Sequence, residues 1–315
     1  MGIFATVVQA GLSTTIQDLG RPGFRHLGVP LSGAADPISL ALANTALGNP
    51  ANAPAMECTL KGPTLKFAAE GKIALGGAPM NATVNDVPVE FYTPVKVSSG
   101  DTLTIGQTNI GARCYIAFAG GLCASTFLGS ASTYQPAAFG GHDGRTLTAG
   151  DELCLAELET GSPREIAPVY RPQIGHDFFI RAVEGPEFGQ LTIDAQERFF
   201  HSPWTVGRRA DRMGIQLAGL SMALEKSAPL ASSAVFPGTV QCPPDGSPFL
   251  LSVDAQTIGG YPRIAQVIAA DLPLLGQMRP NDKVWISRIT HEDAREITVK
   301  KSALIDDILP GGLFR

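Results

Sequence analysis

Turn-forming residues interrupt this chain too often for long helices. It holds 35 glycines and 24 prolines among 315 residues, and charged residues make up only 17%. Between the turns lie short runs rich in β-branched and aromatic residues, such as those at 82–92, 95–106, 113–121 and 178–184. Such residues favour strands, whereas glycine and proline favour turns. The sequence therefore predicts a mainly β protein rather than a helical bundle.

The strand-like runs form two groups, separated by a polar stretch that is rich in proline. We expect an N-terminal β lobe over residues 1–160, a linker over 161–176 and a C-terminal β lobe over 177–315. Each lobe is expected to be barrel-like and to carry one short helix.

Both expected helices begin at a proline. Pro37 follows Asp36, which is a favourable N-cap residue, and Gly48 ends the apolar run. Pro262 precedes a second apolar run whose spacing is helical and which reaches Leu275. We therefore expect one helix after each proline.

The net charge, the apolar runs and the cysteines together predict which partners and which cell compartment to expect. A formal net charge of −5 gives no basic surface for a nucleic acid. We expect no signal peptide, and no uncharged apolar run approaches the ~18 residues that span a bilayer. The five cysteines are odd in number and lack C-x-x-C spacing, which favours reduced, mostly buried thiols in a cytoplasm. We therefore expect a cytoplasmic protein with no nucleic-acid or membrane partner.

Several familiar cofactor and nucleophile motifs are missing. The chain has no G-x-x-x-x-G-K-[ST] loop, no G-x-S-x-G elbow and no Met-Lys pair for covalent biotin. Its five histidines never fall three or four residues apart, so we expect no metal site. These absences predict that any nucleotide chemistry requires a partner chain.

Residues 11–49 hold the densest group of candidate site residues. Asp18, Arg21 and Asp36 are spread over a stretch punctuated by glycines rather than along one helix face. Glycine permits positive φ and close backbone approach, and loops on a rigid scaffold often carry function. Two interpretations stay open: a binding or catalytic loop, and a set of tight turns whose charges face water.

Three later sequence motifs contain further candidate site residues. Arg145 follows Gly-Gly pairs within 119–153, whose backbone N–H groups can form an anion-binding nest. Arg212 belongs to a Gly-Arg-Arg-Ala-Asp-Arg-Met-Gly phrase, and arginine binds carboxylate or phosphate with a bidentate fork. Gln256 and Tyr261 flank a Gly-Gly turn before the second expected helix, whose N-terminus favours anions. The alternatives are hairpin ends, a salt-bridged turn and a core tyrosine.

Together these phrases resemble one family over nearly the whole chain. T-T-x-Q-D-x-G-R-x-G begins at Thr14, and G-V-P-x-S-G-A-x-D, L-G-S-x-S-T, R-M-G, V-Q-x-P and Q-T-x-G-G-Y-P follow in that order. This order resembles the KipA/PxpC family, whose members are also called allophanate hydrolase subunit 2 or biotin-dependent carboxyltransferase proteins. The resemblance implies cyclophilin-like β-barrel lobes.

The resemblance also implies an activity that is shared with other subunits. PxpC members of the family form part of a bacterial ATP-dependent 5-oxoprolinase, which opens 5-oxo-L-proline to L-glutamate. The implied partners are a PxpB/KipI-like subunit (AHS1) and a PxpA-like subunit (LamB/YcsF), and ATP is expected to bind with or through them. Two alternatives stay open: a KipA-type regulator that binds a KipI-like protein without catalysis, and the carboxyltransferase component of a urea carboxylase-like enzyme.

On this interpretation, Asp18 and Asp36 are candidate general bases or orienting acids, and Arg21 is a candidate for stabilising negative charge. The expected substrate-binding residues are polar side chains of the family phrases: Ser32, Thr133, Arg145, Arg212, Gln256 and Tyr261. We expect the arginines and Gln256 to line one concave surface. The chain departs from the family pattern at 232–235, where Ser-(Glu or His)-Gly-Val becomes Ser-Ser-Ala-Val, so the exact substrate stays open.

Overall fold

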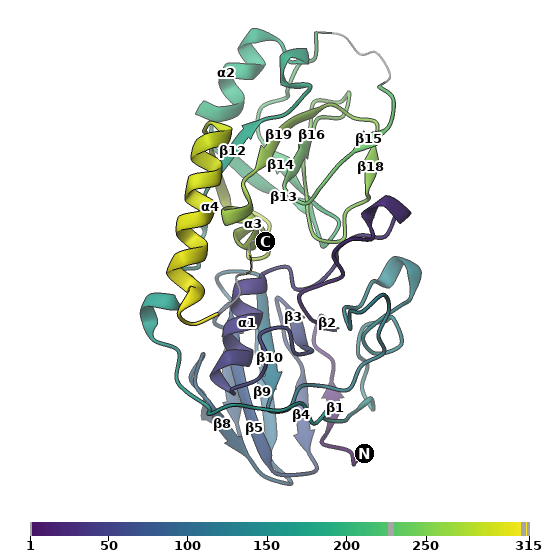
Figure 1. The fold of residues 1–315 in the computed structure, drawn as a ribbon, viewed down its shortest axis with the longest axis vertical. Helices are drawn as coiled ribbons and strands as arrows, with labels where there is room; N and C mark the ends of the chain where they lie inside the picture. Colours follow the sequence, from purple (N-terminus) through teal and green to yellow (C-terminus); the bar gives the residue numbers. More distant parts are fainter. Residues whose placement is uncertain (1, 226–229, 310–312, 314–315) are drawn as a thin grey trace. The chain divides into compact units, whose positions relative to one another are not determined.

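The structure is a computed structural model that describes residues 2–225, 230–309 and 313. The chain divides into two compact units, each built mainly from strands (Figure 1). The first unit contains the residues up to 21, then 32–174 and 305–313, and the second contains 22–31 and 175–304. The predictions of a mainly β fold and of two β lobes with short helices are confirmed.

Two antiparallel sheets form the first unit (Figure 1). The strand order in the larger sheet is β11-β1-β4-β9-β6-β7, with β1 Ala5–Gln9, β4 Thr64–Phe67, β6 Ala82–Val84, β7 Val87–Pro88, β9 Thr102–Ile105 and β11 Glu152–Leu153. The order in the smaller sheet is β2-β3-β10-β5-β8, with β2 Ser13–Gln17, β3 Ala55–Thr59, β5 Gly71–Gly77, β8 Val95–Val97 and β10 Arg113–Phe118.

The core of the first unit lies around β10. All six residues of this strand are buried, because α1 (Pro37–Ala46) packs over both β10 and the neighbouring strand β5. Phe118 at the end of β10 meets Phe4 edge-on, and the Phe4 ring also meets Phe67 in the larger sheet. These aromatic contacts join the two sheets in one hydrophobic core.

Helix α1 forms where the sequence predicts it. The Asp36 side chain accepts a hydrogen bond from the backbone N–H of Ser39 at 3.1 Å, and Pro37 occupies the first turn. Gly76 in β5 allows the helix to approach the sheet closely, since a Cβ there would lie 2.6 Å from the Ser39 carbonyl oxygen. Helix and sheet are therefore in backbone-to-backbone contact.

Seven strands close into a barrel in the second unit (Figure 1). The order is β12-β19-β16-β17-β14-β13-β20, with β12 Asp177–Glu184, β13 Trp204–Ala210, β14 Gly214–Ala218, β16 Thr239–Gln241, β17 Phe249–Leu251, β19 Arg263–Val267 and β20 Lys283–Arg288. Strands β12 and β20 run parallel, and the other neighbours are antiparallel. Trp204 and Phe199 are buried in the barrel core. A separate hairpin pairs β15 (Ser233–Ala234) with β18 (Ile258–Gly259).

The helices of the second unit are α2 (Ile193–His201), α3 (Leu272–Leu275) and α4 (His291–Asp306), whose last two residues group with the first unit. Short 3₁₀ turns complete the structure: η1 Arg25–Leu27, η2 Gln135–Ala137, η3 Pro168–Tyr170, η4 Phe188–Gln190 and η5 Ala269–Asp271. Among the described residues, no helix is both long enough and apolar enough to cross a membrane.

The prediction of a helix directly after Pro262 is wrong. Residues 263–267 form β19, which lies between β12 and β16 and is needed to close the barrel. Ile264 and Val267 are spaced as on a helix, but β-branched residues also favour strands, and pairing on both sides decides the outcome. Helical structure starts only at η5 and continues into α3, where Pro273 stands in the first turn.

Candidate functional site

Hydrogen bonds connect the Asp18 side chain to the loop that follows Phe127. Its Oδ1 accepts hydrogen bonds from the Gly20 N–H at 2.8 Å and from the Ser130 and Ser132 hydroxyls at 2.6 and 2.5 Å. Its Oδ2 accepts the Ala131 N–H at 2.7 Å, and the residue is 8% exposed. A buried carboxylate with this many donors holds two loops together.

Arg21 is buried beneath the same loop. Its guanidinium donates to the carbonyl oxygens of Phe127 and Ser132 and lies 4.8 Å from the Phe139 ring centre. With 1% of its surface exposed, Arg21 lines no open surface. Gly140 makes room for it, because a Cβ there would lie 3.2 Å from the Arg21 guanidinium and 2.1 Å from the Ser132 carbonyl oxygen.

The two predicted hydroxyl residues, Thr133 and Ser32, are also buried. Thr133 donates from Oγ1 to the Ile16 carbonyl at 2.9 Å, which fixes its loop against β2. Ser32 has a φ of 53°, in the left-handed region that non-glycine residues rarely adopt. Its Oγ makes no hydrogen bond within the described part of the chain.

Asp36 lies in a buried polar cluster at the start of α1. Its Oδ2 accepts the Ser39 hydroxyl at 2.6 Å, while its backbone N–H donates to the Tyr115 hydroxyl at 2.8 Å. The Tyr115 hydroxyl donates in turn to Glu57 at 2.8 Å. Burial, followed by the charges of Glu57 and Asp36, raises the pKa of Tyr115 well above its usual range. The cluster therefore holds Tyr115 as a neutral donor.

Arg145 forms a two-pronged ion pair with Asp151, with N–O distances of 2.7 and 2.8 Å. His142 adds a third contact to Asp151, at 3.4 Å. The hydrogen bonds from Arg145 lower the pKa of Asp151 far below the usual carboxyl range. The guanidinium fork is therefore engaged by an acid of its own loop.

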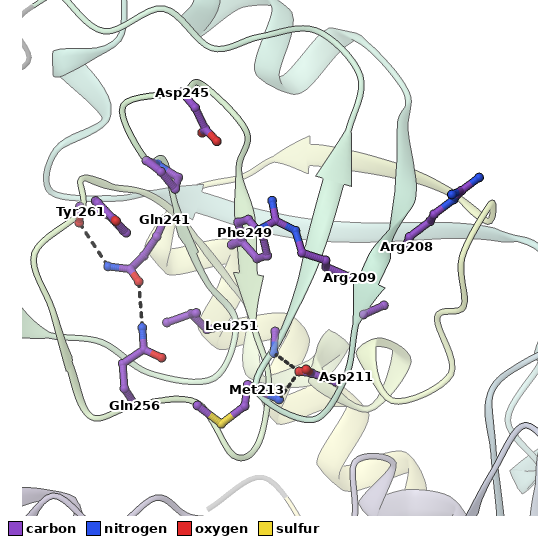
Figure 2. A pocket seen from close by; sticks show the side chains of 13 residues that line it. Arg208, Arg209, Asp211, Met213, Gln241, Asp245, Phe249, Leu251, Gln256 and Tyr261 are labelled. Carbon is purple, nitrogen blue, oxygen red and sulfur yellow. Dashed lines mark hydrogen bonds between the residues drawn. The ribbon is translucent and has the colours of Figure 1, made fainter. Parts of the chain in front are cut away.

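A cavity with converging polar groups lies in the second unit and has a volume of about 570 Å³. Figure 2 shows the side chains that line it. Its lining comes from strands β13, β14, β16 and β17, the loops that follow them and the segment between β18 and β19: Arg208, Arg209, Ala210, Asp211, Met213, Gly214, Gln241, Pro243, Asp245, Phe249, Leu251, Gln256 and Tyr261. Gln241 donates to the Tyr261 carbonyl at 3.2 Å and accepts from the Gln256 amide at 3.1 Å. These hydrogen bonds between the two glutamine side chains and the Tyr261 carbonyl hold one wall of the cavity in place.

Arginines on β13 give the opposite wall its charge. Figure 2 shows Arg209 beside Phe249, and the Arg209 guanidinium lies 4.8 Å from the centre of the Phe249 ring. The Arg209 Nε donates to Gln216 at 3.3 Å. Within residues 2–225 and 230–309, neither Arg208 nor Arg209 forms an ion pair with an acid. An arginine without an acid partner at a cavity wall suits a carboxylate or phosphate ligand.

Arg212 lies in the turn between β13 and β14, next to the cavity. Its guanidinium pairs with the buried Asp254, with Nε–Oδ2 and Nη2–Oδ1 distances of 2.6 and 3.1 Å. The Asp211 carboxylate accepts the N–H groups of Met213 and Gly214, which fixes the turn. The Arg212–Asp254 ion pair therefore stabilises the turn at the rim of the cavity.

Arg25, in the segment 22–31 of the second unit, supports the Gln256 wall. It donates to the carbonyl oxygens of Val235 and, at 3.4 Å, of Gln256, and it lies 5.2 Å from the Phe236 ring centre. Partial burial lowers the pKa of Arg25, and no acid among the described residues forms an ion pair with it. Arg25 thus helps to position the cavity residue Gln256 by donating to the backbone carbonyl oxygen of Gln256.

The family is shown by a match over most of the chain. Residues 27–288 match the family described as "Carboxyltransferase domain, subdomain A and B". The chain belongs to this family. In this family member, the described residues contain no cluster of three His, Cys, Asp or Glu side chains that could hold a metal ion.

Two bacterial relatives match this carboxyltransferase-family chain along nearly their whole length. The C subunit of the 5-oxoprolinase of Escherichia coli K12 is 38% identical, over 91% of this chain and 92% of its own. The protein of the same name from Haemophilus influenzae is 36% identical, over 93% and 94%. The resemblance to the KipA/PxpC family is confirmed.

A solved structure has the same fold. The crystal structure of the K. lactis urea amidolyase matches 97% of this chain with a TM-score of 0.93 and 29% identity. This chain spans about a fifth of that protein, with 20% covered.

The carboxyltransferase fold brings only some of the predicted site residues together. Gln256 and Tyr261 line one cavity, and Arg212 lies in the turn beside it. The others belong to the first unit, where all but Arg145 are buried: Asp18, Arg21, Ser32, Asp36, Thr133 and Arg145. The predicted concave surface does not include Arg21, because that side chain is buried.

Sequence reasoning missed the residues that complete the cavity, above all Arg209, Gln241 and Phe249. A signal existed for two of them. Arg209 is in the same phrase as Arg212, and Gln241 is the glutamine of V-Q-x-P. Phe249 carries no such signal, since an aromatic residue in a strand is typical of a hydrophobic core.

Proposed function

We propose that this chain is the C subunit of a cytoplasmic, ATP-dependent 5-oxoprolinase, which helps to open 5-oxo-L-proline to L-glutamate together with partner subunits. The observation that carries the proposal is the match to two proteins named as C subunits of 5-oxoprolinase, over more than nine-tenths of both lengths. A match of this extent leaves no large domain of those relatives without a counterpart here.

The cavity of the second unit supports a substrate of this kind. Oxoproline carries one carboxylate and one lactam amide, so it needs a cation and hydrogen-bonding groups a few ångströms apart. Arg209 supplies the cation, and the Gln241 and Gln256 amides face it from the other wall (Figure 2). The Phe249 ring offers an apolar surface for the ring methylenes.

The chemistry of lactam opening indicates which step each subunit performs. A lactam carbonyl is a poor electrophile, and phosphorylation of its oxygen by ATP makes the ring carbon open to attack by water. Because this chain has no P-loop, we assign ATP to the PxpB/KipI-like or PxpA-like partners. The chain's own contribution is to hold the carboxylate with Arg209 and to orient the ring with amides.

Reconstitution tests the proposal. The purified chain is mixed with its PxpB-like and PxpA-like partners, ATP and 5-oxoproline, and glutamate and ADP are measured. We expect both products in equal amounts, and their loss when this chain is left out. No glutamate from the complete mixture overturns the proposal, as does a tight complex with the KipI-like partner that never turns over.

The carboxyltransferase role is a second candidate, because the fold matches a urea amidolyase with a TM-score of 0.93. In that role the chain accepts carboxylated biotin from a separate carrier protein, since its sequence contains no Met-Lys pair for covalent biotin. Carboxylation that depends on a biotinylated carrier, without glutamate formation, selects this role instead.

A further inference from the structure

Four of the five cysteines face each other in two pairs across antiparallel backbone. Cys58 on β3 is the register partner of Cys114 on β10. Cys123 and Cys154 flank the bridge between Leu122 and Leu155, and the Cys123 N–H donates to the Cys154 carbonyl at 2.9 Å. The spacing of these residues in the sequence gives no hint of either pair.

The expected Cα separation of both pairs is compatible with a disulfide. Residues directly opposite each other in a hydrogen-bonded antiparallel pair have Cα atoms about 5.5 Å apart and side chains on one face. Disulfides span Cα separations of about 4.4–6.8 Å and Cβ separations of about 3.5–4.5 Å. Because opposite Cβ atoms in such a pair lie about 4.5–5.5 Å apart, the two backbone segments must move slightly closer for the bond to form. The Leu60 N–H donates to the Ala112 carbonyl two residues along, which gives the Cys58–Cys114 pair the same hydrogen-bonded register.

The pairs differ in access to solvent. Cys58 and Cys114 are fully buried, and burial raises the pKa of Cys58 to about 12, so this thiol stays protonated. Cys123 and Cys154 are only partly buried. Oxidation of thiols follows exposure and thiolate character, so a small oxidant reaches the second pair first.

We propose that Cys123 and Cys154 form a redox-active thiol pair that a hydroperoxide oxidises to an intramolecular disulfide. One thiol attacks the peroxide and becomes a sulfenic acid, with release of one water. The other thiol attacks that sulfur and expels a second water, so two thiols and one hydrogen peroxide give one disulfide and two waters. The Cys123 thiol gives up its hydrogen bond to the Leu155 carbonyl, which is 3.1 Å long.

The disulfide would close the loop 124–153 at its base. This loop contains Ser130 and Ser132, which bind Asp18, and it ends beside the Arg145–Asp151 pair. Oxidation therefore restrains the polar network of the first unit, and reduction releases it. Partial burial and the neighbouring Cys154 raise the pKa of Cys123, so the reaction is expected to be slow.

The test uses the full chain, treated with hydrogen peroxide over a time course and then alkylated under denaturing conditions without reductant. Peptide mass spectrometry is expected to find a Cys123–Cys154 cross-link, with Cys58, Cys114 and Cys242 alkylated. Cleavage within 124–153 by a protease should slow after oxidation and recover with dithiothreitol. Cys154→Ser should lose both effects, whereas Cys242→Ser, the control in the second unit, should keep them.

Three results would overturn the proposal. One is full alkylation of all five thiols throughout a time course that extends well beyond the time in which the same peroxide dose oxidises a model thiol peptide. Another is a cross-link between Cys58 and Cys114 in the folded chain. The third is an oxidised Cys123 that stops at sulfinic acid while Cys154 remains a thiol.

Discussion

Substitution of Asp18 by asparagine separates a structural role from a catalytic one. The carboxylate accepts four hydrogen bonds, two from backbone N–H groups and two from serine hydroxyls. An amide has one acceptor and one donor end. Whichever way the new side-chain amide turns, its NH₂ group faces at least one donor, either the N–H of Ala131 or the N–H of Gly20.

The cost can be estimated from these contacts. Asp18→Asn removes one charge-assisted hydrogen bond and leaves one buried N–H unsatisfied, and each of these costs about 1–3 kcal/mol. A total of about 3 kcal/mol lowers the melting temperature of a unit of this size by roughly 6–12 °C. Asp86→Asn is the control, because Asp86 is an exposed turn residue with a φ of 65° that asparagine tolerates well.

The assay combines differential scanning calorimetry of both variants with the turnover of the reconstituted complex. We expect Asp18→Asn to melt early and to keep substantial turnover per folded molecule at low temperature. Unchanged melting together with a collapse of turnover would refute the structural reasoning and restore Asp18 as a general base.

Three further predictions concern other contacts. Asp151→Asn should lower the melting temperature at pH 7, but the difference from wild type should shrink below about pH 3.9, because the stability from a carboxyl of depressed pKa is lost as acid protonates it; an equal difference at all pH values contradicts this. Gly76→Ala should destabilise the first unit by about 1–3 kcal/mol in urea unfolding, since the new methyl group meets the Ser39 carbonyl; unchanged stability would show that α1 can shift freely. Arg25→Met should raise the KM for substrate more than it lowers kcat, and a kcat loss alone would rule out its positioning role.

Local chemistry made part of the fold predictable. Short β-branched runs between turns predicted two β lobes, and the Asp36–Pro37 pair predicted the start of α1, because an N-cap is a local interaction. The helix expected after Pro262 failed for the opposite reason. Pairing of β19 with two strands distant in sequence overrides the local periodicity.

The site was harder to predict, because a buried and an exposed arginine look alike in a sequence. Arg21 and Arg209 both stand in glycine-containing phrases, yet one holds a loop together and the other lines a cavity. Their difference depends on where acids and carbonyls lie after folding. Arg145 meets Asp151 only six residues away, a pairing that the nest interpretation did not consider.

Steady-state kinetics of the reconstituted complex with Arg209→Gln tests the central claim that the cavity of the second unit binds the substrate carboxylate. Loss of one charge-assisted pair costs about 1.5–3 kcal/mol, which corresponds to a rise of about 10- to 150-fold in KM for 5-oxoproline. Arg288→Gln, which removes an exposed arginine paired with Glu184 outside the cavity, should leave KM unchanged. A KM for Arg209→Gln equal to that of Arg288→Gln and of wild type would contradict the account.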